Sequence, residues 1–224
     1  MKSNIIFEPH IGANYGKDFS IFKKKTLILG GSHYIDESEY DLAKAADRAD
    51  LAGFTQEIIG MYLDPECKGA WKSTFSKFIN SVYGHPASQE ERKALLDSAV
   101  FYNYLQEVAG DNAYVANQYD YNAPKHLEAL KEVLDQTKPE VIISWGDHVW
   151  KALPKDLGYG ERTQVKGIIA NNVPFDYCFE YPYLDQEITL IGLYHPSSSH
   201  YVKDVYREVF CSTILNLKET GFPI

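Results

Sequence analysis

The sequence predicts an α/β domain of three layers, α/β/α, in which helices cover both faces of a central four-stranded and mainly parallel sheet. Short apolar runs of strand length alternate with stretches of helical periodicity, which is typical of βαβ units. The 224 residues are enough for one large domain. Because 45% of them are hydrophobic and 24% are charged, the composition is that of an ordinary globular protein.

Four apolar runs are expected to form the strands of the sheet. Each run is short and rich in aliphatic or aromatic side chains, and turn-forming or polar residues follow it. The predicted strands are residues 26–29, 99–104, 141–144 and 188–193. Residues 175–181 fit either an edge strand or an ordered aromatic loop, and residues 158–172 are expected to form a loop.

Six segments between and after these runs are expected to be helical. The run Ser88-Gln89-Glu90-Glu91 is typical of a capping box. Pro124 suits the first turn of a helix that Pro139 ends. In the last helix, apolar residues recur at spacings of three and four from Val202 to Leu217. The predicted helical segments are residues 37–61, 73–82, 89–98, 124–138, 147–153 and 200–217.

Charge and hydropathy limit the partners and the location of the protein. A net charge of −9 is unfavourable for holding nucleic acid by phosphate neutralisation, although Lys23-Lys24-Lys25, Lys72 and Lys77 offer either a local basic face or a solvated surface. No run approaches the roughly 20 apolar residues of a membrane span, and residues 1–25 lack the apolar core of a signal peptide. We therefore expect a cytoplasmic protein with no membrane partner, a single domain over residues 1–224 with residues 1–25 packed on it as an extension.

The cysteines and the spacing of other ligand-type residues predict no metal and no cofactor. Cys67, Cys178 and Cys211 are odd in number and widely spaced, so we expect buried thiols rather than disulfides. No spacing of His, Asp or Glu resembles a metal site. Residues 7–15 are expected to cross the surface rather than to cover a cleft, and the sequence leaves the oligomeric state open.

Polar, aromatic or glycine-rich residues lie at or near the end of each predicted strand. In open parallel sheets, ligands bind beyond the carboxyl ends of the strands. The amide of Asn103 has apolar and aromatic neighbours, so it is either a fixed member of a hydrogen-bond network or a reader of a ligand. His148 is expected to be an exposed first-turn residue rather than a ligand-binding one. The four segments are Gly30-Gly31-Ser32-His33-Tyr34, Phe101-Tyr102-Asn103-Tyr104, Trp145-Gly146-Asp147-His148 and His195-Pro196-Ser197-Ser198.

Taken together, these segments resemble the uracil-DNA glycosylase superfamily. Its members have a Gly-x-Asp-Pro-Tyr or Gly-x-Asn-Pro loop after the first strand and an asparagine in the second strand that reads uracil. They also have a Trp-Gly turn after the third strand and a His-Pro-Ser motif after the last. The resemblance spans residues 26–217. It implies the fold of that superfamily and a hydrolase of base-excision DNA repair, with DNA or a nucleobase-containing small ligand as its partner.

The resemblance also implies roles for individual residues. His195 is the expected donor to the oxygen of the departing base, and Asn103 is expected to read the edge of a pyrimidine. Trp71 or Phe75 would supply a stacking face, although core packing is the stronger expectation for Phe75. The other expected binding residues are Gly31 and Tyr34 in the first loop, with Ser73, Ser197 and Ser198 as phosphate contacts.

Two departures from the pattern concern catalysis. Ser32 stands where the superfamily has a water-activating carboxylate, and His33 replaces the following proline. Serine cannot act as a carboxylate base. The imidazole of His33, with an unperturbed pKa of about 6.5, fits general-base work, and Asp36 follows closely. In place of the apolar wedge that glycosylases insert into DNA stands Ser199-His200-Tyr201. This segment offers either Tyr201 as a substitute wedge or, as the stronger expectation, the cap and first turn of the last helix.

Three functions therefore remain open at the level of the sequence. The first is a DNA glycosylase that releases uracil or a related base. The second is a divergent protein on the same fold that binds or hydrolyses a nucleoside, a nucleotide or another small ligand. The third is a catalytically silent binding protein.

Overall fold

The computed structural model describes residues 3–34, 48–110 and 119–215, and its centre is a seven-stranded, mixed sheet. The strands of this sheet are β1 (His10–Ile11), β2 (Thr26–Gly30), β3 (Ala99–Asn103), β4 (Val141–Trp145), β5 (Thr163–Gln164), β8 (Cys178–Tyr183) and β9 (Gln186–Leu193). Their order across the sheet is β1-β3-β2-β4-β9-β8-β5. A separate hairpin consists of β6 (Ile169–Ala170) and β7 (Val173–Pro174).

The four predicted strands form the parallel centre of the sheet. Strands β3, β2, β4 and β9 are neighbours in that order, and each pairs in parallel with the next. The prediction of a four-stranded sheet is wrong, because β1 is added to β3, β8 to β9 and β5 to β8, each in antiparallel pairing. Residues 175–181, for which the sequence allows an edge strand or a loop, lead into and include most of strand β8. Residues 158–172, which were expected to form a loop, contain β5 and β6 as well as loop.

The helices also correspond to the predicted segments, with two corrections. They are α2 (Arg48–Leu51), α3 (Phe54–Leu63), α4 (Lys72–Tyr83), α5 (Gln89–Asp97), α7 (Pro124–Thr137), α8 (Asp147–Ala152) and α9 (Lys203–Thr213). The single helix expected over residues 37–61 is wrong where it is described, because Gly53 lies outside both helices and separates α2 from α3. Helix α9 is shorter than expected and ends at Thr213.

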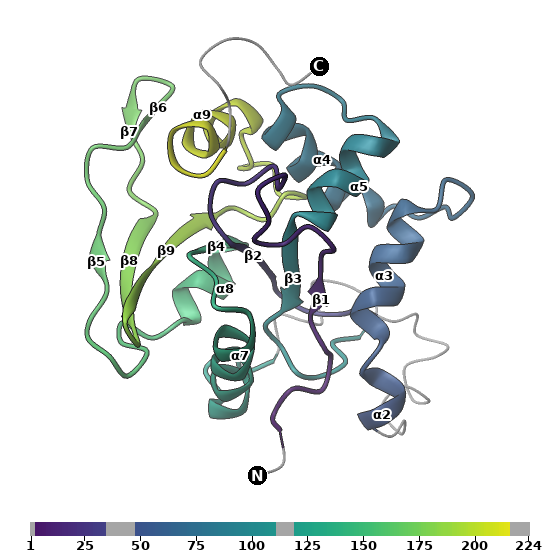
Figure 1. Cartoon of the computed structure of the whole chain (residues 1–224), viewed down its shortest axis with the longest axis horizontal. Coiled ribbons are helices and arrows are strands. Elements are labelled where there is room, and N and C mark those ends of the chain that lie inside the picture. Colours follow the sequence, from purple (N-terminus) through teal and green to yellow (C-terminus); the bar gives the residue numbers. More distant parts are fainter. Residues whose placement is uncertain (1–2, 35–47, 111–118, 216–224) are drawn as a thin grey trace.

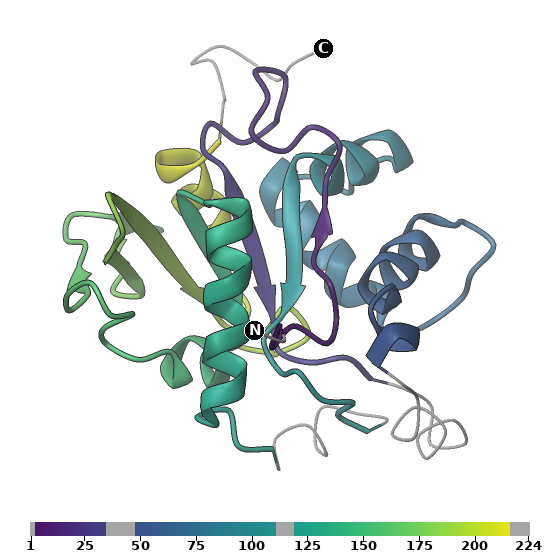
Figure 2. The same ribbon diagram turned by 60° about the horizontal axis from the view of Figure 1, so that its bottom comes forward.

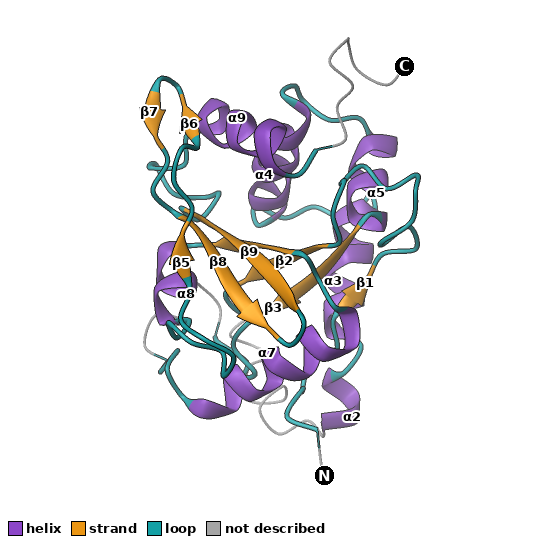
Figure 3. Cartoon of the chain, turned by 60° about the vertical axis from the view of Figure 1, so that its left-hand side comes forward, coloured by secondary structure: helices purple, strands orange, loops and turns teal. Residues whose placement is uncertain are grey.

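Alternating side chains of the central strands build a hydrophobic cluster on each face of the sheet. In β2, Leu27 and Leu29 belong to the cluster that α7 and α8 cover, whereas Ile28 belongs to the cluster of α3, α4, α5 and α9. Figure 3 shows the sheet from its edge, with α7 on one side and α4 and α9 on the other. Because both faces are covered, the central strands are buried along their length.

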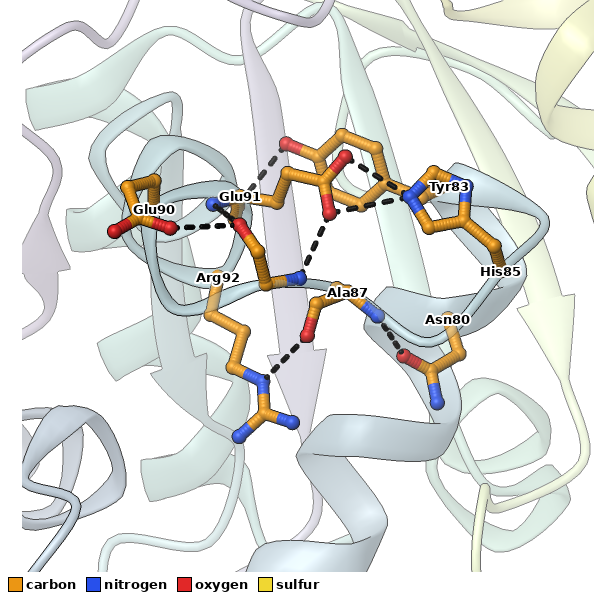
Figure 4. Close-up of polar contacts among 8 residues, drawn as sticks. Asn80, Tyr83, His85, Ala87, Glu90, Glu91 and Arg92 are labelled. Atoms are coloured by element: carbon orange, nitrogen blue, oxygen red, sulfur yellow. Dashed lines mark hydrogen bonds and ion pairs between the residues drawn. The ribbon is translucent and has the colours of Figure 1, made fainter.

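The turn between α4 and α5 is fixed by the predicted capping box. The Oγ of Ser88 accepts a hydrogen bond from the backbone N–H of Glu91, and the Glu91 carboxylate accepts one from the backbone N–H of Ser88 at 2.8 Å. The same carboxylate binds Nε2 of His85 at 2.9 Å, and Asn80 accepts from the backbone N–H of Ala87 (Figure 4). These bonds satisfy backbone donors that the first turn of α5 leaves free.

The N-terminal segment packs on the domain as an edge strand and not only as a surface crossing. Strand β1 pairs antiparallel with β3 (Figure 1). Just before it, the side chain of Phe7 is completely buried, and Oε1 of Gln106 accepts hydrogen bonds from the N–H groups of Ile6 and Phe7. Residues 5–11 are therefore integrated into the fold.

Two remaining expectations concern the cysteines and the membrane. All three thiols are free, but only Cys178 is buried, so the expectation of three buried thiols is wrong for the partly exposed Cys67 and Cys211. In the part of the chain that the structure describes, no helix has the length and apolar character needed to cross a membrane.

Candidate functional site

A pocket of about 510 Å³ opens beyond the carboxyl ends of the parallel strands. Figure 2 shows β2 and β3 running in the same direction, with their carboxyl ends at the bottom of the view. The chain passes from β2 to β3 on one side and then to β4 on the other, so the crevice lies where ligands bind in open α/β sheets. The lining residues are Gly30, Gly31, Ser32, His33, Tyr34, Phe54, Glu57, Ile58, Met61, Trp71, Thr74, Phe75, Phe101, Asn103, Trp145, His148 and His195.

Eight of the eleven predicted site residues line this one pocket. They are His195, Ser32, His33, Asn103, Tyr34, Gly31, Trp71 and Phe75. The end of β2 with the first four residues of the loop after it, the end of β3 and the loop after β9 meet there. They do so because parallel strands place their carboxyl ends on one edge of the sheet. The three predicted serines lie elsewhere and are described below.

Asn103 is held at the end of β3 by a network of buried polar groups. Its Nδ2 lies 3.1 Å from Nδ1 of His33, and Nε2 of His33 lies 3.2 Å from Oγ1 of Thr55. An amide nitrogen only donates, so Nδ1 of His33 accepts, and its Nε2 carries the proton and donates to Thr55. A Cβ at Gly30 would lie 2.1 Å from Oδ1 of Asn103, so only glycine fits beside this amide.

His33 supports Asn103 and is shielded from solvent. Its ring is 3% exposed and packs against Phe7 at 4.6 Å and Phe54 at 5.0 Å between ring centroids. Burial lowers the pKa of His33 to about 3, so the ring is neutral at neutral pH. Since both ring nitrogens are engaged, His33 has no nitrogen left to take a proton from water.

His195 has the same fixed tautomer as His33, but its second ring nitrogen makes no hydrogen bond to a described residue. Nδ1 of His195 accepts from the backbone N–H of Ser197 at 3.3 Å and lies 2.7 Å from Oγ of Ser197. A backbone N–H cannot accept, so the proton of the neutral ring sits on Nε2. Burial, with smaller effects of His148 and Lys77, lowers the pKa of His195 to about 4. The loop therefore presents a neutral imidazole N–H donor to the pocket.

Aromatic and aliphatic side chains form an apolar wall of the same pocket. Phe75 belongs to the core and also lines the pocket, so the core packing expected for it and the stacking position are both observed. Trp71 is half-buried and meets Phe75 edge to face at 6.0 Å. Trp145 lies on the other side of Phe75, with 5.2 Å between ring centroids. Helix α3 adds Ile58 and the 44% exposed Met61 to this wall.

The three predicted serines do not line the pocket. Ser73 is exposed on α4. The hydroxyl of Ser197 turns back to His195, and Oγ of Ser198 accepts from the backbone N–H of His200. The hydroxyl of Tyr201 bonds Ser81 at 3.0 Å, so this ring is packed against the domain and is not a protruding wedge. Asp36, the carboxylate considered beside His33, lies outside the described residues.

Sequence reasoning missed several lining residues. The most important is His148, because the expectation that it is an exposed first-turn residue is wrong: it is half-buried and lines the pocket. The glycine before its helix was the available signal, since a glycine turn lets a first-turn side chain fold back over the strand end. Glu57, Ile58 and Met61 on α3 carried no such signal.

The pocket is weakly charged. Among the described lining residues, Glu57 is the one acidic residue, and none is Lys or Arg. Burial lowers the pKa of His33, His148 and His195 alike. The site therefore offers neutral donors and acceptors against an apolar wall, which suits a planar polar ring better than an anion.

Comparison of the sequence with protein-family models and with curated proteins finds no match. We therefore infer the function from the geometry and the chemistry of the pocket.

Proposed function

We propose that this protein is a uracil-DNA glycosylase-like hydrolase that cleaves the N-glycosidic bond of uracil or a related base in DNA. One observation carries the proposal: Asn103 and His195, whose Nε2–H is a free donor, line the same pocket as Trp71 and Phe75. A flipped-out base is typically held in this way, stacked on an aromatic side chain and read along its Watson–Crick edge.

The amide of Asn103 matches the edge of uracil. Its Nδ2 gives one hydrogen to His33 and keeps the second, while Oδ1 makes no hydrogen bond to a described residue. The pair can donate to a carbonyl oxygen of uracil and accept from its ring N–H. With Nδ2 donating to His33, the amide presents the pattern that matches uracil, whereas the reverse pattern would suit cytosine.

His195 matches the charge that develops during cleavage. When the C1′–N bond breaks, negative charge gathers on the oxygen of the departing base, and a neutral N–H donor at that point stabilises the transition state. A ring whose pKa lies at about 4 stays neutral at working pH, so its donor needs no change of charge.

The fold supports the same assignment at the level of the superfamily. We propose that the domain is a divergent uracil-DNA glycosylase fold, since the four motif-bearing segments lie at the ends of four neighbouring parallel strands. A Gly-x-Asp-Pro loop is absent, and Ser32 occupies the carboxylate position.

A second candidate function is hydrolysis of a free nucleoside. It is favoured by the absence of Lys and Arg among the described lining residues and by the net charge of −9. Both features weaken the attraction of a DNA backbone without affecting recognition of a neutral base.

The experiment measures uracil release under single-turnover conditions from three substrates: single-stranded DNA with one deoxyuridine, the same site in a duplex, and free deoxyuridine. We expect release from DNA by the wild-type protein and loss of release in Asn103→Ala and His195→Ala. His200→Ala, a change of an exposed histidine outside the pocket, is the matched control and keeps wild-type activity. Release from deoxyuridine alone would favour the second candidate, and no release from any substrate at high protein concentration would refute both.

A further inference from the structure

The most distinctive unassigned group in the pocket is His148, which lies at the N-terminus of α8 beside the loop after β2. We propose that His148 is the general base that takes a proton from the attacking water, in place of the missing carboxylate at Ser32. This inference rests on the proposed N-glycosidic hydrolysis and assigns a further catalytic residue to it.

Two glycines leave the space that the His148 ring occupies. A Cβ at Gly146 would lie 2.5 Å from Cε1 of His148, and a Cβ at Gly31 would lie 3.1 Å from Nε2. Gly146 also has a φ of 96°, which side-chain-bearing residues rarely adopt. The imidazole is thus folded back between the ends of β4 and β2, and its Nε2 lies against the residue that precedes Ser32.

A buried tyrosine borders the same space. The ring of Tyr121 meets the His148 ring edge to face at 5.1 Å between centroids, and Tyr121 is only 8% exposed. The hydroxyls of Tyr121 and Ser32 are buried and adjacent, because a hydrogen bond to Ser32 opposes the larger effect of burial on the pKa of Tyr121. Neither has another hydrogen-bond partner among the described residues. A single bond between two hydroxyls leaves one O–H donor unused, so a water or a ligand oxygen at this position would satisfy it.

Among the described histidines that line the pocket, His148 is the one with no hydrogen-bonded ring nitrogen. Both nitrogens of His33 and Nδ1 of His195 are engaged, whereas neither nitrogen of His148 makes a hydrogen bond to a described residue. Burial lowers the pKa of His148 from its ordinary value, and the neighbouring Asp147 opposes this shift. The ring is therefore neutral at neutral pH and can accept a proton.

The proposed step balances without a further reactant. The oxygen of water bonds to C1′ while the C1′–N bond breaks, and its electron pair leaves with the base. The water proton passes to His148, and the Nε2–H of His195 hydrogen-bonds the base oxygen where the charge gathers. His148 then returns its proton through solvent, which also protonates the released base.

Glu57 is the rival for this role. It lines the pocket, but its side chain is exposed on α3, whereas the hydroxyls of Ser32 and Tyr121 are buried. A water bound to an exposed carboxylate stays in contact with solvent, unlike a water held by these buried hydroxyls. Glu57→Gln is consequently the matched variant that separates the two assignments.

The pH dependence follows from the groups that face His148. These are Asp147 on its own helix, which is ion-paired with Lys151 at 2.6 Å, His195 from the loop after β9, and Tyr121 from the segment before α7. A base must be unprotonated, so the rate falls as pH drops through the pKa of His148 in the acid range. Removal of the imidazole should abolish this fall in rate, which is the acid limb of the pH–rate profile.

The test compares wild type, His148→Asn, Glu57→Gln, Gly31→Ala and the control His200→Asn by single-turnover uracil release across the acid pH range. We expect His148→Asn to lower the maximal rate about 100-fold or more, to lose the acid limb and to keep the wild-type thermal shift with uracil. Gly31→Ala, whose new methyl group displaces the ring, should cost on the order of 10-fold. Glu57→Gln and His200→Asn should stay within about 3-fold of the wild-type rate, because neither substitution removes the proposed general base.

Two results would overturn the assignment while leaving the proposed function intact. One is an active His148→Asn with an unchanged acid limb. The other is a Glu57→Gln variant that shows both the loss of rate and the loss of the acid limb. If His148→Asn does not give a cooperative melt, Gly31→Ala decides, and an unchanged rate in that variant overturns the assignment. If the wild-type protein releases no base at all, the proposed function and this assignment fail together.

Discussion

The two sides of the pocket differ in how completely their polar groups are hydrogen-bonded. On the β3 side, Asn103, His33 and Thr55 form a closed chain of bonds packed against Phe7. On the β4 side, His148 makes no hydrogen bond to a described residue, and the buried hydroxyls of Tyr121, which packs against its ring, and of Ser32 have no described partner beyond each other. A satisfied network fixes one geometry, whereas unsatisfied groups favour a bound water or ligand. The difference assigns recognition to the β3 side and water binding to the β4 side.

The largest effect is expected at His195, which serves both sides. Replacement of His195 by alanine removes the neutral N–H donor and should slow base release about 100- to 1,000-fold, which corresponds to about 2.7–4 kcal/mol of barrier. Uracil binding should weaken much less, because the donor acts mainly on charge that develops in the transition state. Single-turnover rates and uracil affinities, measured on the same preparation, check this prediction. Equal losses in rate and affinity would contradict it.

The second prediction concerns the pH dependence of stability on the β3 side. The pKa of His33 is about 3 in the folded protein and about 6.5 in the unfolded chain, so only the unfolded chain gains this proton between these values. The stabilisation is complete above pH 6.5 and is lost as pH falls, by about 2 kcal/mol at pH 5. Urea unfolding of wild type and of His33→Gln from pH 7 to 5 measures the difference. Other buried histidines affect both proteins equally, so parallel pH profiles would refute the assignment to His33.

Two conservative substitutions, one on each side of the pocket, should differ in how much they lower the free energy of unfolding. Thr55→Val keeps the shape but leaves Nε2–H of His33 without an acceptor, so it should cost about 1–3 kcal/mol of unfolding free energy. Ser32→Ala removes a hydroxyl whose one described partner is the hydroxyl of Tyr121, and it should cost less, below about 1 kcal/mol. Denaturant midpoints at neutral pH provide the comparison. Similar costs for both variants would mean that the two sides are equally satisfied.

The central strands and the ends of their loops were predictable from the sequence, for a physical reason. Buried parallel strands are continuous apolar runs, and parallel order alone places Asn103, Ser32 and His195 on one edge of the sheet. The two-residue strands β1 and β5 have no periodicity of their own and exist because a partner strand offers free backbone groups.

The missed parts of the site depend on packing that no local pattern encodes. Glu57 and Met61 face the pocket because of how α3 leans on the sheet, which its own sequence does not specify. The hydroxyl of Ser197 turns inward to His195 and not outward to a phosphate, because Nδ1 of that ring needs a donor. The prediction of an exposed His148 failed because no local pattern shows the space for its ring. That space exists because Gly31, which follows β2 and is distant in the sequence, has no side chain.

The most direct measurement of the central claim is the thermal shift that uracil produces in wild type and in Asn103→Ala. At ten times its dissociation constant, uracil should stabilise the wild-type protein by about 1.4 kcal/mol and raise Tm by roughly 3–6 °C. Asn103→Ala should show no shift at the same concentration, and cytosine should shift neither protein. An equal shift in both proteins, or no shift with millimolar uracil in the wild type, would contradict recognition of the base by Asn103.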